Sequence, residues 1–244
     1  MALDPVLDAC RTPNWYPQLS AFSLPTSFVA LQADEIEALA AGEDASAPVP
    51  KRAVRRLRAV MKRFPYNRFL SVDLAAPVDT DRFKNKRGAI RSAESAWNVL
   101  AESERVRESA KRGEVTSICV RPFRRMDITR EFRLFVKDGK LFAMSQYWLV
   151  KHFPKLEKTK KKFWEKAESF VKQNAWAFPL KDVVMDIYFT SSGKILITDL
   201  NPLSAPTDPL MFSEWEKFDW TGEAAGIRIV PPPHTLSGDV NVSF

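Results

Sequence analysis

The chain has 244 residues, of which 45% are hydrophobic and 27% are charged. This is the composition of an ordinary globular protein, and it excludes disordered, collagen-like and coiled-coil classes. Thirty-seven Lys and Arg residues against 30 Asp and Glu residues give a formal charge of +7, which favours polyanionic partners such as nucleotides, nucleic acid or acidic protein surfaces. The first residues carry no basic region or apolar run, and no later stretch approaches the roughly 20 apolar residues that a membrane helix needs, so we expect a cytoplasmic protein without membrane contact.

The chain is poor in the residues that build common metal and phosphate sites. It has only two cysteines, Cys10 and Cys119, and only two histidines, His152 and His234. A disulfide framework and a Cys-rich or His-rich metal centre are therefore excluded. The eight glycines are too far apart to form a G-x-G-x-x-G turn or a P-loop. A phosphate site would have to use side-chain cations and metal-binding carboxylates.

The N-terminal part of the chain shows mainly helical periodicity. Residues 1–32 are expected to be largely irregular. Further along, helices are predicted for residues 33–40, 51–63, 92–100 and 102–113, and a strand is predicted for residues 69–74. The helix at 51–63 contains five arginines and is both basic and amphipathic.

The C-terminal part is predicted to be rich in strands. The strands are expected at residues 117–120, 131–136, 141–145, 183–190 and 194–200, with a Lys-rich helix at 151–174 between them. We therefore expect an α+β fold with an N-terminal α+β lobe over residues 1–114 and a C-terminal β-rich lobe over residues 115–244. Trp97, Trp164 and Trp176 fall at apolar positions of predicted helices or their ends and are expected in the core.

The last predicted hairpin carries a pair of acidic residues. We expect a two-residue loop at Ser192 and Gly193. In that register Asp186 faces Asp199, and Asn201 lies on the same face of the sheet. Two carboxylates directly opposite each other repel, whereas Mg²⁺ would use them and the amide oxygen as ligands. The alternative is that Asp199 and Asn201 make turn hydrogen bonds where the strand ends.

A second group of polar residues supplies positive charge. Arg121 ends one predicted strand, and Glu131 and Arg133 share a face of the next. Arginines on a sheet that also carries the acidic pair would bind ribose or phosphate oxygens by bidentate contacts. The alternative is an arginine–carboxylate network that neutralises itself. Glu131 either takes part in the ligand site or orients an arginine. No catalytic acid or base is assigned.

The sequence also contains an ordered series of short motifs. They are WYP at 15–17, P-x-D at 77–79, CVRPF at 119–123, EFRLFVKDGKL at 131–141, SQ at 145–146, DIY at 186–188, DLNP at 199–202, DPLMF at 208–212 and WE at 215–216. In this order they resemble the cell division cycle protein 123 family over most of the chain. Trp15, in the first motif, is either an anchor for a partner or a cover for the sheet.

The resemblance implies an atypical ATP-grasp fold, in which two lobes with antiparallel sheets clasp ATP and Mg²⁺. It implies that Asp186, Asp199 and Asn201 bind the metal ions. The candidate cofactor-binding residues are Arg121, Pro122, Phe123, Glu131 and Arg133, and the resemblance implies that the backbone near Cys119 to Phe123 forms the adenine-binding hinge. The eukaryotic members assemble translation initiation factor 2 by binding its γ subunit, which would make that subunit the protein partner.

The sequence departs from the family pattern in the first lobe. The family usually has a Lys or Arg near Ser71 and further basic residues near Ala75 and Val78. Four basic residues lie slightly downstream and are candidates to replace them as phosphate contacts: Arg82, Lys84, Lys86 and Arg87.

Three functions are compatible with these features. The first is an ATP-binding and magnesium-binding assembly factor that docks a protein partner under nucleotide control. The second is an ATP-dependent ligase that activates a carboxylate or a nucleic-acid end through a phosphorylated intermediate. The third is an RNA-binding protein that uses the basic helices at 51–63 and 151–174.

Overall fold

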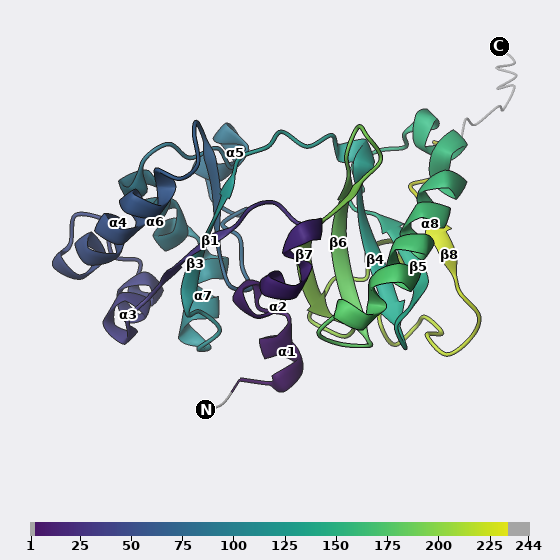
Figure 1. The fold of residues 1–244 in the computed structure, drawn as a ribbon, viewed down its shortest axis with the longest axis horizontal. Helices are drawn as coiled ribbons and strands as arrows, with labels where there is room; N and C mark the ends of the chain where they lie inside the picture. The colour runs from purple at the N-terminus through teal and green to yellow at the C-terminus, as the bar shows by residue number, and fades with distance from the viewer. Residues whose placement is uncertain (1–2, 234–244) are drawn as a thin grey trace, which may run out of the picture.

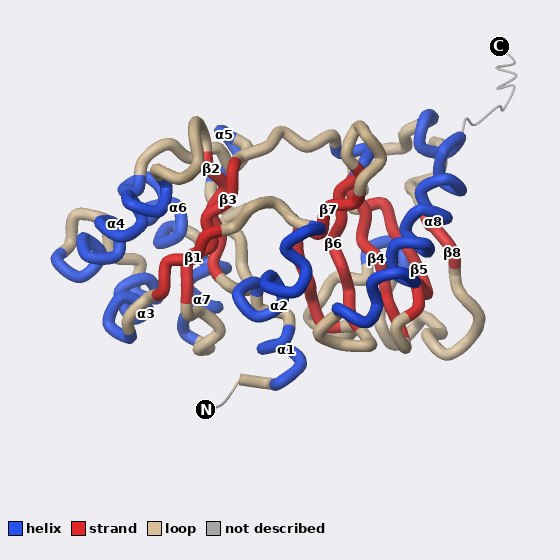
Figure 2. The backbone as a smooth tube through the Cα atoms, in the orientation of Figure 1, coloured by secondary structure: helices blue, strands red, loops and turns tan. Residues whose placement is uncertain are grey.

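The computed structural model describes residues 3–233 and has two sheets set side by side (Figures 1 and 2). The helices are α1 (Pro5–Ala9), α2 (Thr12–Leu19), α3 (Ala33–Ala41), α4 (Pro48–Met61), α5 (Asp81–Lys86), α6 (Ala93–Glu102), α7 (Glu104–Lys111) and α8 (Pro154–Asn174). The strands are β1 (Ser27–Ala30), β2 (Arg68–Val72), β3 (Ser117–Pro122), β4 (Glu131–Lys137), β5 (Lys140–Gln146), β6 (Val183–Phe189), β7 (Ile195–Pro202) and β8 (Gly226–Arg228).

The first lobe is a small antiparallel sheet with helices on one face. Its strands run in the order β1-β3-β2, and α3, α4 and α6 lie on the side away from the second sheet (Figure 1). Alternate side chains of the central strand point into this layer, where Ile118 and Val120 pack with the fully buried Leu57 and Trp97. The remaining alternate positions of β3, Cys119 and Arg121, are left for the opposite face.

Local sequence signals set the ends of these helices. The side chain of Glu35 accepts a hydrogen bond from the Gln32 backbone N–H at 2.9 Å, and the two residues form the capping box that begins α3. The helix ends at Gly42, whose φ of +76° suits glycine. Ser92 begins α6 by accepting from the Ser95 N–H at 3.1 Å.

The second lobe is a five-stranded sheet in the order β7-β6-β4-β5-β8. Helix α8 covers one face of this sheet, where Phe132 packs against Phe163 with ring centroids 5.1 Å apart. Part of the opposite face is covered by the segment after β7, because Phe135 packs there against Phe212 and Trp215. Polar side chains occupy the rest of that face. One strand pair differs from the expected antiparallel arrangement, since β8 is parallel to β5.

The division between the two sheets does not coincide with residue 114. Strand β3 follows that residue but pairs with β1 and β2 of the first sheet. The segment that contains α1 and α2 contributes Cys10, which directly follows α1, and Trp15 and Leu19 of α2 to the core of the second sheet. The two units that pack together are therefore interleaved in sequence, and the expected lobes of 1–114 and 115–244 stay a prediction.

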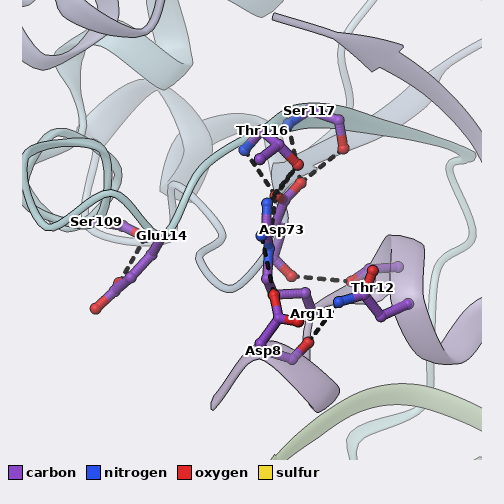
Figure 3. Close-up of polar contacts among 9 residues, drawn as sticks. Asp8, Arg11, Thr12, Asp73, Ser109, Glu114, Thr116 and Ser117 are labelled. Atoms are coloured by element: carbon purple, nitrogen blue, oxygen red, sulfur yellow. Dashed lines mark hydrogen bonds and ion pairs between the residues drawn. The ribbon is translucent and has the colours of Figure 1, made fainter. Parts of the chain in front are cut away.

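A buried polar cluster centred on Asp73 joins α2 to the first sheet (Figure 3). The Asp73 carboxylate accepts backbone N–H bonds from Thr116 and Ser117 at 2.7 and 3.0 Å. It also accepts their hydroxyl hydrogens at 2.7 and 2.6 Å, and it is paired with Arg11, whose Nε donates at 3.0 Å. The Asp73 carbonyl accepts from the Thr12 backbone N–H at 3.1 Å. This cluster fixes how the α1–α2 segment lies against β2 and β3.

Several sequence expectations are wrong in detail. The expectation of a largely irregular start is wrong for the described residues 3–32, because they form α1, α2 and β1; the prolines at 13 and 17 obscure the helical period. Helix α5 and strand β8 are short and were not predicted. Trp15 and Trp97 are fully buried, whereas Trp176 is 84% exposed and is not a core residue. Among residues 3–233, no helix is long and apolar enough to cross a membrane.

Candidate functional site between the two sheets

The β6–β7 hairpin brings the two predicted acidic residues opposite each other. Asp186 pairs with Asp199, as the sequence predicts. The connecting loop is longer than expected, because Thr190 N–H bonds to the Lys194 carbonyl across it. A bulge between Asp186 and Ile187 shifts the register by one residue and offsets the longer loop. The pairing is therefore right although the predicted two-residue turn is wrong.

Asp186 is engaged by an arginine of the neighbouring strand. Arg133 lies directly opposite it in the β4–β6 pair, and its Nε and Nη2 donate to the two Asp186 oxygens at 2.7 and 2.8 Å. The Arg133 Nη1 donates to the carbonyl of Asp208 at 2.7 Å. Both charged side chains are less than 10% exposed. Arg133 and Asp186 thus form the bidentate arginine–carboxylate pair that was the alternative to ligand binding by Arg133.

Asp199 has no such cationic partner. One of its oxygens accepts the N–H of Leu200 at 3.0 Å. Burial and the nearby Asp186 raise the pKa of Asp199 to about 7, although Arg121 and Arg133 lower it in part. The carboxylate thus lies where additional positive charge would stabilise its ionised form.

Asn201 lies two residues further along β7, on the same face of the sheet as Asp199. Its amide Nδ2 is buried and has no hydrogen-bond partner. A buried amide without a partner is unfavourable by about 1–3 kcal/mol. Asp199 and Asn201 together therefore offer oxygen ligands of the kind that Mg²⁺ binds, beside a donor that lacks an acceptor.

Arg121 reaches from the first sheet to the second. Its Nε donates to Thr26 Oγ1 at 3.2 Å, and its Nη1 donates to the Thr198 carbonyl of β7 at 2.8 Å. The third nitrogen, Nη2, is buried without a partner. A guanidinium nitrogen in this state has the geometry and charge to take an anionic oxygen. Ser23 forms a second link between the sheets, donating to the Ile197 carbonyl at 2.8 Å.

The other predicted nucleotide residues lie where the chain passes between the sheets. Pro122 ends β3 opposite Arg68, and the Phe123 backbone N–H donates to the Asn67 carbonyl at 3.0 Å. Both side chains are half-buried. The structure thus places Pro122 and Phe123 directly after Arg121, at the start of the connection to β4.

Glu131 and Tyr147 complete the polar face. Burial raises the pKa of Glu131 to about 7, and Asp186 and Asp127 add to this effect against a hydrogen bond from Trp148. Tyr147 was missed by the sequence reasoning. Its ring lies 5.4 Å from Arg133 Cζ, and Asp186 together with burial raises its pKa. Its position directly after the SQ motif at 145–146 was the only available signal.

The three first-lobe positions that depart from the family pattern lie in different environments. Ser71 is buried opposite Cys119, on the face of β3 that also carries Arg121. Ala75 packs against the first core, and Val78 is exposed. Arg82 donates to the Ser95 hydroxyl at 2.7 Å within its own lobe. Ser71 is thus the departure that shares a sheet face with the candidate site.

The described residues 3–233 offer no second site of comparable chemistry. Within residues 3–233, no group of three or more His, Cys, Asp or Glu side chains is arranged to hold a metal ion. A hollow of about 510 Å³ lies elsewhere, in the first lobe. It is lined by residues of α4 and α6 and of the loop before α4, among them Lys51, Arg55 and Glu94.

Comparisons with known proteins identify the family. The model of the D123 family matches residues 89–237. The chain belongs to the D123 family. Residues of this chain are 36% identical over 88 positions to a Xenopus laevis protein named translation initiation factor eIF2 assembly protein, which covers 36% of this chain and 26% of the relative. They are 39% identical over 85 positions to cell division cycle protein 123 of Candida glabrata, which covers 34% and 24%. The aligned part spans about a quarter of the length of these D123 relatives.

The solved structure of Cdc123 from Schizosaccharomyces pombe has a TM-score of 0.80 at 18% identity. The alignment covers 95% of this chain and 99% of that chain. At this identity the likeness shows the fold alone. The expected α+β fold with two lobes is confirmed at this level.

Proposed function

We propose that this chain binds ATP together with Mg²⁺ between its two sheets, and that the nucleotide-bound form docks a protein partner. The observation that carries the proposal is a pair of buried nitrogens without partners, Arg121 Nη2 and Asn201 Nδ2. They lie on elements of opposite lobes and flank Asp199, whose pKa is raised. Such unsatisfied groups are rare in native proteins, and they are expected where a ligand completes the hydrogen bonding.

The donor set fits this ligand. Asp199 and Asn201 would hold a magnesium ion, with Asp186 beside them, and Arg121 would contact the nucleotide. Bound Mg²⁺ and phosphate would supply the positive charge that Asp199 lacks and the acceptor that Arg121 lacks. Arg133 holds Asp186 in place through its two hydrogen bonds. Arg121 donates a hydrogen bond to Thr198 across the lobes. A ligand that binds Arg121 would therefore also affect how the two lobes are placed.

The partner part of the proposal follows the printed names of the relatives. Those proteins are named as assembly proteins of translation initiation factor eIF2. We propose the γ subunit of that factor as the partner of this chain. The aligned region covers 36% of this chain and 26% of the Xenopus laevis relative.

Isothermal titration of ATP, with and without Mg²⁺, tests the nucleotide site. The informative variant is Asp199→Asn, and Asp81→Asn, whose side chain is 94% exposed, is the matched control. Because the raised pKa of Asp199 means that its neutral form is favoured in the fold, the Asn variant should be no less stable than the parent. Metal-dependent binding should be lost in Asp199→Asn and kept in the control. Equal binding by both variants would end the proposal.

One observation favours a second candidate, an ATP-dependent ligase. Glu131 has a pKa of about 7 and lies on the same strand face as Arg133. A carboxyl group with that pKa is suited to proton transfer near neutral pH. Release of ADP or AMP with a carboxylate and an amine acceptor, abolished in Glu131→Gln, would support the ligase. Binding of ATP without turnover over a broad acceptor panel would favour the assembly role.

RNA binding is less well supported than either of these. Three arginines of α4 are already paired within the first lobe, Arg52 with Asp34, Arg56 with Glu35 and Arg58 with Glu94. The hollow beside α4 has no aromatic side chain among its lining residues on which bases would stack.

A further inference from the structure

A short loop after β5 exposes three consecutive large apolar side chains. Trp148, Leu149 and Val150 are 41%, 43% and 66% exposed. The other exposed large apolar residues of the described chain stand singly, such as Tyr66 and Trp176. Single exposed apolar residues are normal, whereas a contiguous group marks an interaction site. We call residues 147–151 the Trp148 loop.

The Trp148 loop is held in one conformation. The side-chain Nε2 of Gln146 donates to the Trp148 carbonyl at 2.5 Å and to the Lys151 carbonyl at 3.2 Å. The Trp148 ring packs edge-on against Tyr147, with centroids 5.6 Å apart. A part-buried tryptophan fixed by its neighbours loses little conformational entropy on binding, and this is the usual character of an interface anchor.

Positive charge lies next to the loop. Lys151, Lys155, Lys158 and Lys162 form what we call the lysine flank, and they are spaced so that those within α8 share one helix face. They are exposed, and no carboxylate of a described residue lies within 4.0 Å of them, whereas Lys160 is paired with Glu157 at 2.5 Å. The combination of an apolar centre and a cationic border matches a partner with apolar and acidic side chains.

The fold disfavours a membrane or an RNA in this position. The apolar face of α8, including Leu156, Ala167 and Phe170, is packed into the core of the second lobe, so α8 has no apolar stripe left for a bilayer. Trp148 is the one exposed aromatic ring of the loop, whereas single-stranded RNA is bound by successive stacking rings.

We propose that the Trp148 loop and the lysine flank form a docking surface for an acidic protein segment that carries a large apolar side chain. The surface adjoins the candidate site, because Tyr147 contacts both Trp148 and Arg133. The exposed side chains of the loop and the charges of the lysine flank do not depend on bound nucleotide, so this proposal is independent of the nucleotide site. If the proposed assembly role holds, the partner would dock here.

Selection of displayed random peptides on the intact protein tests this surface. Each round is depleted on the triple variant Trp148→Ser, Leu149→Ser, Val150→Ser, and Trp176→Ser is the control, because it removes an even more exposed tryptophan outside the loop. The enriched peptides should combine acidic residues with a large apolar one. Their affinity should fall at least tenfold in the triple variant and in Lys155→Glu with Lys158→Glu, and it should be unchanged in the control.

Other outcomes would overturn the proposal. They are the absence of enrichment over the triple variant, the enrichment of basic peptides, or loop-dependent binding to polyuridylate or to vesicles with 30% phosphatidylserine that exceeds binding to the peptides. ATP titration of the parent protein separates the two proposals. ATP binding without peptide selection would refute the docking surface alone, and peptide selection without ATP binding would refute the nucleotide site alone.

Discussion

The substitution Asp73→Asn tests how strongly the buried cluster joins the two parts of the molecule. Its carboxylate side chain is fully buried and faces donors only, from Thr116, Ser117 and Arg11. An asparagine keeps the shape but turns one acceptor into a donor that faces other donors, and it leaves Arg11 without its buried partner. Breaking a buried ion pair from one side destabilises a protein by about 3–5 kcal/mol.

For a chain of this size, that loss corresponds to a fall in Tm of about 6–20 °C. Urea unfolding followed by fluorescence would measure the free energy of unfolding, and Asp81→Asn, at an exposed carboxylate, should change it by less than about 0.5 kcal/mol. A loss below about 1 kcal/mol in Asp73→Asn would refute the view that this cluster holds α1 and α2 against the first sheet.

Three further predictions concern single positions. The raised pKa of Glu131, about 7, means that the folded state holds a proton that the unfolded state releases above its ordinary pKa near 4.5, so Glu131 lowers parent stability as pH rises from about 4.5 to 7, as Asp199 also does. Glu131→Gln should reduce that slope and be more stable at pH 8 by about 1–3 kcal/mol, and parallel pH profiles would contradict this. Trp15→Ala, at a fully buried ring, should lose about 3–5 kcal/mol, whereas Trp176→Ala should lose less than about 0.5 kcal/mol; equal losses in urea unfolding would show that the burial argument is wrong. Gly88→Ala should lower the free energy of unfolding by about 2–4 kcal/mol, because φ is +79° and a Cβ would lie 2.7 Å from an aromatic ring. Gly113→Ala should lower it by about 1 kcal/mol, because φ is +73° but the space is open. Thermal unfolding that ranks the two variants in reverse order would refute the steric account.

The sequence allowed four of the five strands of the second sheet to be predicted closely, because their apolar runs are separated by turn residues. The Asp186–Asp199 pairing was predicted on this basis. The bulge that follows Asp186 has no local signal, since the extra residue, Thr198, is an ordinary strand former. The predicted pairing is therefore correct because the longer loop and the bulge shift the register in opposite directions.

The contacts between distant segments were less predictable. Arg133 was expected to face the acidic pair, but sequence patterns do not decide whether it binds Asp186 or a ligand. The role of Arg121 as a link to Thr198 likewise depends on how the sheets are placed. That placement is set partly by α1 and α2, whose helical period is obscured by prolines.

The central claim is that nucleotide and metal bind between β3 and the β6–β7 hairpin. The most direct test is a crystal structure of the intact chain grown with a non-hydrolysable ATP analogue and Mn²⁺, with the metal located by its anomalous signal. The account predicts a manganese peak within bonding distance of Asp199 and Asn201 and a phosphate oxygen on Arg121 Nη2. A nucleotide bound elsewhere, or a manganese peak away from these side chains, would contradict it.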